Sequence, residues 1–163
     1  MATVPAVSQL SPGDKAPAFK LLDQSGAPFG LGDSLKGAKS PHLIYFYPKA
    51  DTPGCTTQAC GLRDVAGDVG DVVIVGISPD APDKQAKFDA KYGLGFPLLS
   101  DVDHQVAEAY GVWGERSLYG RKYMGIIRSA FLIDAKGKIA EAWYKISPKD
   151  TPARLVKWVS ENA

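Results

Sequence analysis

Residues 42–78 read HLIYFYPKADTPGCTTQACGLRDVAGDVGDVVIVGIS, and this stretch predicts a strand, a helix and a second strand in succession. Its first six and last eight residues are rich in β-branched or aromatic side chains, and a proline follows each run, as expected for buried central strands. Between them, Pro53 suits the first position of a helix, with Thr52 or Asp51 available as its N-cap. A strand, a crossover helix and another strand are the repeating unit of an α/β fold.

The rest of the chain continues this alternation. Helices are expected at residues 83–92, 104–110 and 152–162, and strands at residues 96–99, 126–134 and 139–144. Two short apolar runs around turn residues in the segment 19–33 predict an N-terminal β-hairpin. The segment 111–125 is the least regular and is expected to form a loop. Parallel crossovers combined with an antiparallel C-terminal hairpin predict an α/β fold with a mixed central sheet flanked by helices, in a single domain spanning residues 1–163.

Composition excludes several classes of function. The chain has 163 residues, of which 45% are hydrophobic and 23% charged, so a disordered, fibrous or disulfide-rich protein is not indicated. Its 19 Lys and Arg against 18 Asp and Glu give a net charge of +1, without the basic excess of nucleic-acid-binding proteins. The first 17 residues do not resemble a signal peptide, and no apolar run approaches the length of a membrane span. We therefore expect a cytoplasmic protein with no nucleic-acid or membrane partner.

The two cysteines are the candidate reactive groups. Cys55 falls in the first turn of the expected helix, where free backbone N–H groups and the helix dipole favour a thiolate. Cys60 follows five positions later, so the CxxC spacing of thioredoxins is absent. A zinc site would need His42 and His104 as further ligands, and these lack a clustered spacing, so neither a metal nor another cofactor is expected. Two buried, inert cysteines are the alternative that composition alone leaves open.

The segment YFYPKADTPGC, residues 45–55, resembles the active-site motif PxxxTxxC of peroxiredoxins, formed here by Pro48, Thr52 and Cys55. Its continuation through Cys60 is similar to the peroxiredoxin Q group, also called bacterioferritin comigratory proteins. Further stretches resemble the family in the expected order, namely LSPGDKAPAFKLLDQSG, VVIVGISPD, FPLLSD and GIIRSAFLID, the last of which contains Arg128. The chain departs from the family's usual Glu, Phe and Thr at Gln58, Leu62 and Ala130.

The resemblance implies a thioredoxin-like fold and the reduction of hydrogen peroxide or organic hydroperoxides by a cysteine thiolate. It implies that Cys55 is the peroxidatic residue and Cys60 the resolving residue, with Pro48, Thr52 and Arg128 completing the pocket. Thioredoxin or a similar dithiol protein would then reduce the oxidised form. We expect a monomer, with a dimer as the alternative. A general thiol-disulfide oxidoreductase and a redox-sensing binding protein with little turnover are the competing functions.

Elementary chemistry explains why such a site needs hydrogen-bond donors. An ordinary thiol with a pKa of about 8.5 is only roughly 3% ionised at neutral pH, so complete ionisation accelerates attack at most about 30-fold. Preorganised donors that face developing charge contribute roughly 100- to 1,000-fold in other enzymes. We therefore expect Thr52 and Arg128 to act as donors to the reacting atoms.

The spacing of the cysteines predicts that the helix opens during turnover. Five residues of α-helix rise about 7.5 Å and place their first and last side chains roughly 140° apart. A disulfide needs Cα atoms within about 6.8 Å and converging Cβ atoms, so Cys55 and Cys60 cannot bond inside one intact helix. Glycine is a poor helix former, so alanine at position 61 should make the helix harder to open. We therefore expect Gly61→Ala to slow disulfide formation relative to sulfenic acid formation, as a clean test of helix opening.

Overall fold

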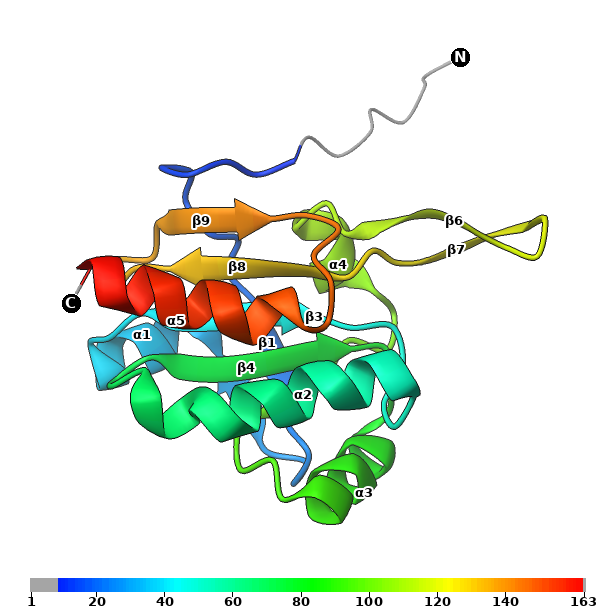
Figure 1. Cartoon of the computed structure of the whole chain (residues 1–163), viewed down its shortest axis with the longest axis horizontal. Coiled ribbons are helices and arrows are strands. Elements are labelled where there is room, and N and C mark those ends of the chain that lie inside the picture. Colours follow the sequence, from blue (N-terminus) through cyan, green and yellow to red (C-terminus); the bar gives the residue numbers. More distant parts are fainter. Residues whose placement is uncertain (1–8, 163) are drawn as a thin grey trace.

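A seven-stranded mixed sheet forms the centre of the computed structural model, which describes residues 9–162 (Figure 1). The strands lie in the order β2 (Pro28–Gly30), β1 (Lys20–Leu22), β5 (Leu98–Ser100), β4 (Val73–Ser78), β3 (His42–Phe46), β8 (Ser129–Ile133) and β9 (Ile139–Trp143). Strands β3, β4 and β5 run parallel, whereas the other neighbouring pairs are antiparallel. This is the mixed α/β sheet that the sequence predicts.

Helices cover both faces of the sheet. One face packs against α2 (Pro53–Val65), α3 (Pro82–Tyr92) and α5 (Asp150–Asn162), and the other against α1 (Leu31–Ala38) and α4 (Gln105–Ala109). A short 3-10 helix, η1 (Ala66–Asp68), follows α2. In Figure 1, α2 and α5 lie in front of the sheet and α1 lies behind it.

Burial on both faces explains why the sequence of the central strand β3 is apolar without alternation. Side chains of successive strand residues point to opposite faces, and both faces of β3 are covered. Leu43 and Tyr45 belong to the core beneath α2 and α5, whereas Ile44 and Phe46 belong to the core beneath α1 and α4. All four side chains are fully buried. A strand enclosed in this way is rigid enough to position the loop that follows it.

Most predicted elements are confirmed, with shifts at their ends. The strand–helix–strand unit is present, and helices α3, α4 and α5 match the predicted segments to within two residues. The N-terminal hairpin of β1 and β2 is also present, but it ends at Gly30. Residues 31–33, assigned to the hairpin from the sequence, instead begin α1.

The prediction of a loop at residues 111–125 is wrong. This segment contains β6 (Trp113–Leu118) and most of β7 (Arg121–Ile126), which form an antiparallel hairpin that projects from the body of the molecule (Figure 1). Tyr119 and Gly120 form its turn, and both have positive φ angles, 51° and 77°. Turns of this kind match the twist of a two-stranded ribbon. Because the hairpin lies largely outside the core, its residues need not alternate between apolar and polar, and the strand pattern is hidden.

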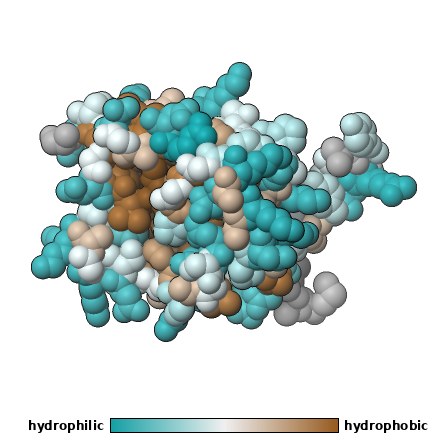
Figure 2. Space-filling model, turned by 90° about the horizontal axis from the view of Figure 1, so that it is seen from below, coloured by the Kyte–Doolittle hydropathy of each residue, from teal (hydrophilic) through white to brown (hydrophobic). Residues whose placement is uncertain are grey.

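The surface is largely polar. The face shown in Figure 2 is mainly hydrophilic, with apolar side chains gathered in one area toward its left side. Among residues 9–162, no helix combines the length and the apolar composition needed to cross a lipid bilayer.

The packing around β3 gives a first prediction. A Cβ atom on Gly76 of β4 would lie 2.9 Å from Cζ and Oη of Tyr45 and 3.0 Å from Cε1 of Tyr47. Since both rings are buried, Gly76→Ala should lower the free energy of unfolding by about 1–3 kcal/mol. The matched control is Gly32→Ala in α1, where a Cβ meets nothing within 4 Å. Urea denaturation of both variants checks this, and equal stability of Gly76→Ala and the native protein would contradict it.

Candidate active site

Cys55 lies in the first turn of α2, directly after the loop that leaves β3. The helix begins at Pro53 with Thr52 as its N-cap, as the sequence predicts. The Cys55 side chain is only 1% exposed and belongs to the core between α2 and the sheet. The unpaired N–H groups of this helix terminus favour negative charge nearby. The sulfur therefore lies at the amino end of a helix, in a place largely shielded from water.

Arg128 reaches Cys55 from the other side of the site. Its Nη1 and Nη2 atoms each lie 3.5 Å from Sγ of Cys55. The antiparallel register of β3 and β8 pairs Phe46 with Ser129, so Arg128 falls at the end of β3 from which the active-site loop departs. Sheet pairing thus brings together two residues that are 73 positions apart.

Gln58 fixes the guanidinium group of Arg128. Nη1 of Arg128 donates to Oε1 of Gln58 over 2.8 Å, and Nε2 of Gln58 donates to Oγ1 of Thr151 over 2.9 Å. The Thr151 hydroxyl in turn donates to the carbonyl oxygen of Ser147. Gln58 is fully buried, so this chain of bonds holds one face of α2 against the start of α5. In the sequence, Gln58 stands out only as a departure from the family pattern, although its position three residues after Cys55 places both side chains on one face of the helix.

Two further predicted residues, Thr52 and Pro48, lie in or beside the loop between β3 and α2. The Thr52 hydroxyl donates to the carbonyl oxygen of Lys49 over 2.8 Å and makes no side-chain capping bond. Pro48 follows β3 and is half-buried. The loop is anchored where the Ala50 N–H donates to Oδ2 of Asp80 over 2.7 Å. The structure thus places Thr52 at the mouth of α2, but its hydroxyl proton is directed at the backbone.

Cys60 lies in the same helix as Cys55, and both cysteines are free. Cys60 is half-buried and packs against the core that contains Cys55. The expectation that Gly61→Ala tests helix opening cleanly is wrong, because a Cβ at Gly61 would come within 2.7 Å of Cγ of Pro152 in α5. That substitution would disturb the contact between α2 and α5 before it affects helix propensity.

Two buried tyrosines adjoin the site without adding charge. Burial raises the pKa values of Tyr45 and Tyr47 well above that of free tyrosine, so both phenols are neutral. The Tyr47 hydroxyl donates to Gln85, whereas Oη of Tyr45 has no hydrogen-bond partner in the described part of the chain. The two phenols therefore contribute no negative charge beside Cys55.

The two histidines have other contacts. His42 is buried in β3, where its ring contacts the Ser34 hydroxyl and the Ser40 carbonyl, and burial lowers its pKa. His104 stacks on Trp113, with ring centroids 3.8 Å apart. Between residues 9 and 162, no group of three or more His, Cys, Asp and Glu side chains is arranged to hold a metal ion.

Comparison with known proteins agrees with this geometry. The model of the AhpC/TSA family matches residues 12–142, and the chain therefore belongs to that family of peroxiredoxins. It is 52% identical over 155 residues to a peroxiredoxin Bcp of Haemophilus influenzae, covering 94% of this chain and 98% of the relative. It is 46% identical over 159 residues to peroxiredoxin Bcp of Escherichia coli, covering 96% of this chain and all of the relative.

A solved structure supports the same assignment. The crystal structure of peroxidoxin BcpB from Mycobacterium tuberculosis superposes with a TM-score of 0.82 at 34% identity, covering 95% of this chain and 99% of that one. Within the family, the chain falls in the group of Bcp, or peroxiredoxin Q, proteins. It is a thiol-dependent peroxidase with the thioredoxin-like fold of that group.

The contacts of Gln58 give a second prediction. Gln58→Ala removes the acceptor that holds Arg128, and a hydrogen bond to a charged group contributes about 1.5–3 kcal/mol. We therefore expect the second-order rate constant for peroxide reduction to fall about 10- to 100-fold. Gln58→Glu is the matched control, since it keeps an acceptor for Arg128 while losing the donor to Thr151, and it should retain more activity than Gln58→Ala. A native rate constant in Gln58→Ala, measured by stopped flow, would refute this role.

Proposed function

We propose that Cys55 is the peroxidatic nucleophile of a two-cysteine peroxidase that reduces hydrogen peroxide and organic hydroperoxides, with Cys60 as the resolving cysteine. The observation that carries the proposal is the position of Arg128, whose two terminal nitrogens both lie 3.5 Å from the Cys55 sulfur. Arg128 contacts the Cys55 thiol and the neutral Gln58 side chain. No carboxylate is among its hydrogen-bond acceptors in residues 9–162. Its positive charge is therefore available to a thiolate.

In the first step, the Cys55 thiolate attacks one oxygen of the peroxide in line with the O–O bond. An S–O bond forms, the O–O bond breaks, and the sulfur loses two electrons to the peroxide. The departing oxygen takes up a proton and leaves as water or an alcohol, while Cys55 becomes a sulfenic acid. Negative charge moves from sulfur to the leaving oxygen, so the several N–H groups of Arg128 can stabilise both ends of this movement.

Thr52 and Pro48 are proposed to shape the pocket around the reacting atoms. The Thr52 hydroxyl can donate to peroxide once it leaves the Lys49 carbonyl, and its oxygen can accept a hydrogen bond from a bound hydroperoxide without moving. Pro48 lies at the end of β3, has no N–H group and is half-buried, which suits a residue that limits the access of water.

In the second step, Cys60 attacks the sulfenic sulfur of Cys55. The S–S bond forms, the S–O bond breaks, and hydroxide leaves as water after taking up a proton. The two cysteines occupy one helix, in which their side chains diverge, so α2 must unwind between them before the bond forms. Thioredoxin or a similar dithiol protein then reduces the disulfide by thiol exchange.

Several features support further parts of the proposal. Both cysteines belong to one chain, so a monomer contains the complete reaction centre. Two free cysteines suit the reducing cytoplasm, which we propose as the compartment. The proposed reaction uses only thiols and peroxide, so we propose no metal or other cofactor. The near-neutral net charge of +1 gives no reason to propose a nucleic-acid partner.

The two cysteines give a third prediction, in which each variant serves as the control for the other. Cys60→Ser should react once with peroxide, form a stable Cys55 sulfenic acid and lose thioredoxin-linked turnover. Cys55→Ser should not react, because a neutral hydroxyl cannot replace a thiolate. Mass spectrometry after dimedone trapping and a coupled NADPH assay measure both steps. Turnover by Cys55→Ser, or normal cycling by Cys60→Ser, would require another nucleophile or another resolving group.

A further inference from the structure

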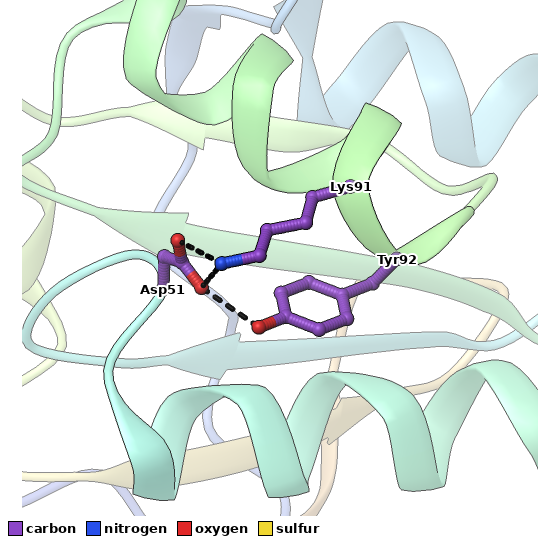
Figure 3. Close-up of polar contacts among 3 residues, drawn as sticks. All are labelled: Asp51, Lys91 and Tyr92. Atoms are coloured by element: carbon purple, nitrogen blue, oxygen red, sulfur yellow. Dashed lines mark hydrogen bonds and ion pairs between the residues drawn. The ribbon is translucent and has the colours of Figure 1, made fainter.

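A polar cluster formed by Asp51, Lys91 and Tyr92 joins the active-site loop to the end of α3 (Figure 3). Nζ of Lys91 lies 2.9 Å from Oδ2 and 3.2 Å from Oδ1 of Asp51, and the Tyr92 hydroxyl donates to Oδ1 over 2.9 Å. These bonds hold the pKa of Asp51 below its usual value, and the bond from Lys91 has the largest effect. The carboxylate is therefore charged at neutral pH. We call these three residues the Asp51 cluster.

The backbone at Asp51 is also unusual. Its φ angle of 59° lies in the left-handed region, which few residues other than glycine adopt. Asp51 immediately precedes Thr52, the N-cap of α2, and lies four residues before Cys55. The Asp51 cluster therefore holds the chain in a turned conformation at the point where the reactive helix begins.

The far end of the segment that contains Cys55 and Cys60 is also attached to the end of α3. Nη1 of Arg63 donates to the carbonyl oxygen of Tyr92 over 2.6 Å, and Arg63 lies three residues after Cys60. The segment that contains both cysteines is thus fastened at each end to the last turn of α3. Helix α3 carries neither cysteine, and its Phe88 side chain is 1% exposed in the core, so it is a fixed support.

We propose that the Asp51 cluster is a positioning contact that keeps the active-site loop closed while Cys55 reacts with peroxide, and that its release admits the unwound form of α2 in which Cys60 reaches Cys55. This inference rests on the proposed two-cysteine function. The step that it controls is the attack of the Cys60 thiolate on the Cys55 sulfenic sulfur, in which the S–S bond forms and hydroxide departs as water.

The direction of the effect on disulfide formation follows from the form of the loop in which the contacts are made. The bonds to Lys91 and Tyr92 form only when the loop lies against α3, so they stabilise the closed form relative to the open one. Removing one partner shifts the equilibrium toward the open form and accelerates disulfide formation. The pair is exposed and its contribution is modest, so the expected change is about three- to tenfold for each partner. The peroxide step should stay within about twofold, because the closed form remains the dominant one.

The test uses variants that leave every residue of the loop and of α2 in place. Lys91→Gln removes the ammonium group, and Tyr92→Phe removes only the hydroxyl while keeping the ring on Phe88. Lys87→Gln is the matched control, because Lys87 lies one turn earlier on α3 and forms no ion pair within the described residues. Stopped-flow fluorescence and rapid-quench mass spectrometry follow sulfenic acid formation and disulfide formation separately in the full chain.

We expect disulfide formation to be about three- to tenfold faster in Lys91→Gln and in Tyr92→Phe, with native rates in Lys87→Gln. Unchanged or slower disulfide formation in both variants would overturn the inference. A matching loss in the peroxide step would also overturn it, since that result indicates a purely structural contact.

Amide hydrogen exchange separates this inference from the proposed function. In the reduced protein, the amides of residues 54–60 should exchange faster in Tyr92→Phe than in the native chain, whether or not the protein reacts with peroxide. Equal exchange contradicts the inference. Failure of native Cys55 to form a sulfenic acid contradicts the proposed function instead.

Discussion

The contact between the Arg128 guanidinium group and the Cys55 sulfur is the interaction that defines the site. Two nitrogens face the sulfur, and one of them is also held by Gln58, which is itself held by Thr151 of α5. A guanidinium group is planar and permanently charged, so fixing one nitrogen fixes the direction of the others. The site thus resembles an electrostatic pocket assembled in advance, in which charge that leaves the sulfur meets donors already in place.

The fold supplies this arrangement through the position of β3. Its parallel neighbour β4 and antiparallel neighbour β8 hold the strand on both edges, while helices bury both faces. The loop that leads to Cys55 and the residue Arg128 then both lie at one end of that strand. The disulfide of the proposed mechanism opposes this rigidity, because Cys55 and Cys60 diverge within α2 and the helix would have to open before they bond. The proposed mechanism therefore requires that the molecule hold Cys55 firmly for one step and release it for the next.

Much of this could be predicted from the sequence, because the decisive signals are local. The apolar runs around β3 and β4, Pro53 at the start of α2 and the motif that contains Cys55 each follow from neighbouring residues. The hairpin of β6 and β7 was missed because it lies mostly outside the core, where burial does not impose a pattern. The roles of Gln58 and Asp51 also cannot be predicted from neighbouring residues. Gln58 bonds to Thr151, 93 positions away, and Asp51 bonds to Lys91 and Tyr92, which are 40 and 41 positions away. The clash at Gly61 arises in the same way, from contact with α5.

The rate constant of sulfenic acid formation in Arg128→Lys, measured by stopped flow with hydrogen peroxide, tests the role of the guanidinium group directly. Lysine keeps the positive charge but offers a point ammonium group in place of two directed nitrogens. If the geometry of the guanidinium group stabilises the transition state, the rate constant should fall by about 100-fold or more, with the fold intact by circular dichroism. A rate constant within about threefold of the native value would show that charge alone suffices and would contradict a role for the geometry of Arg128.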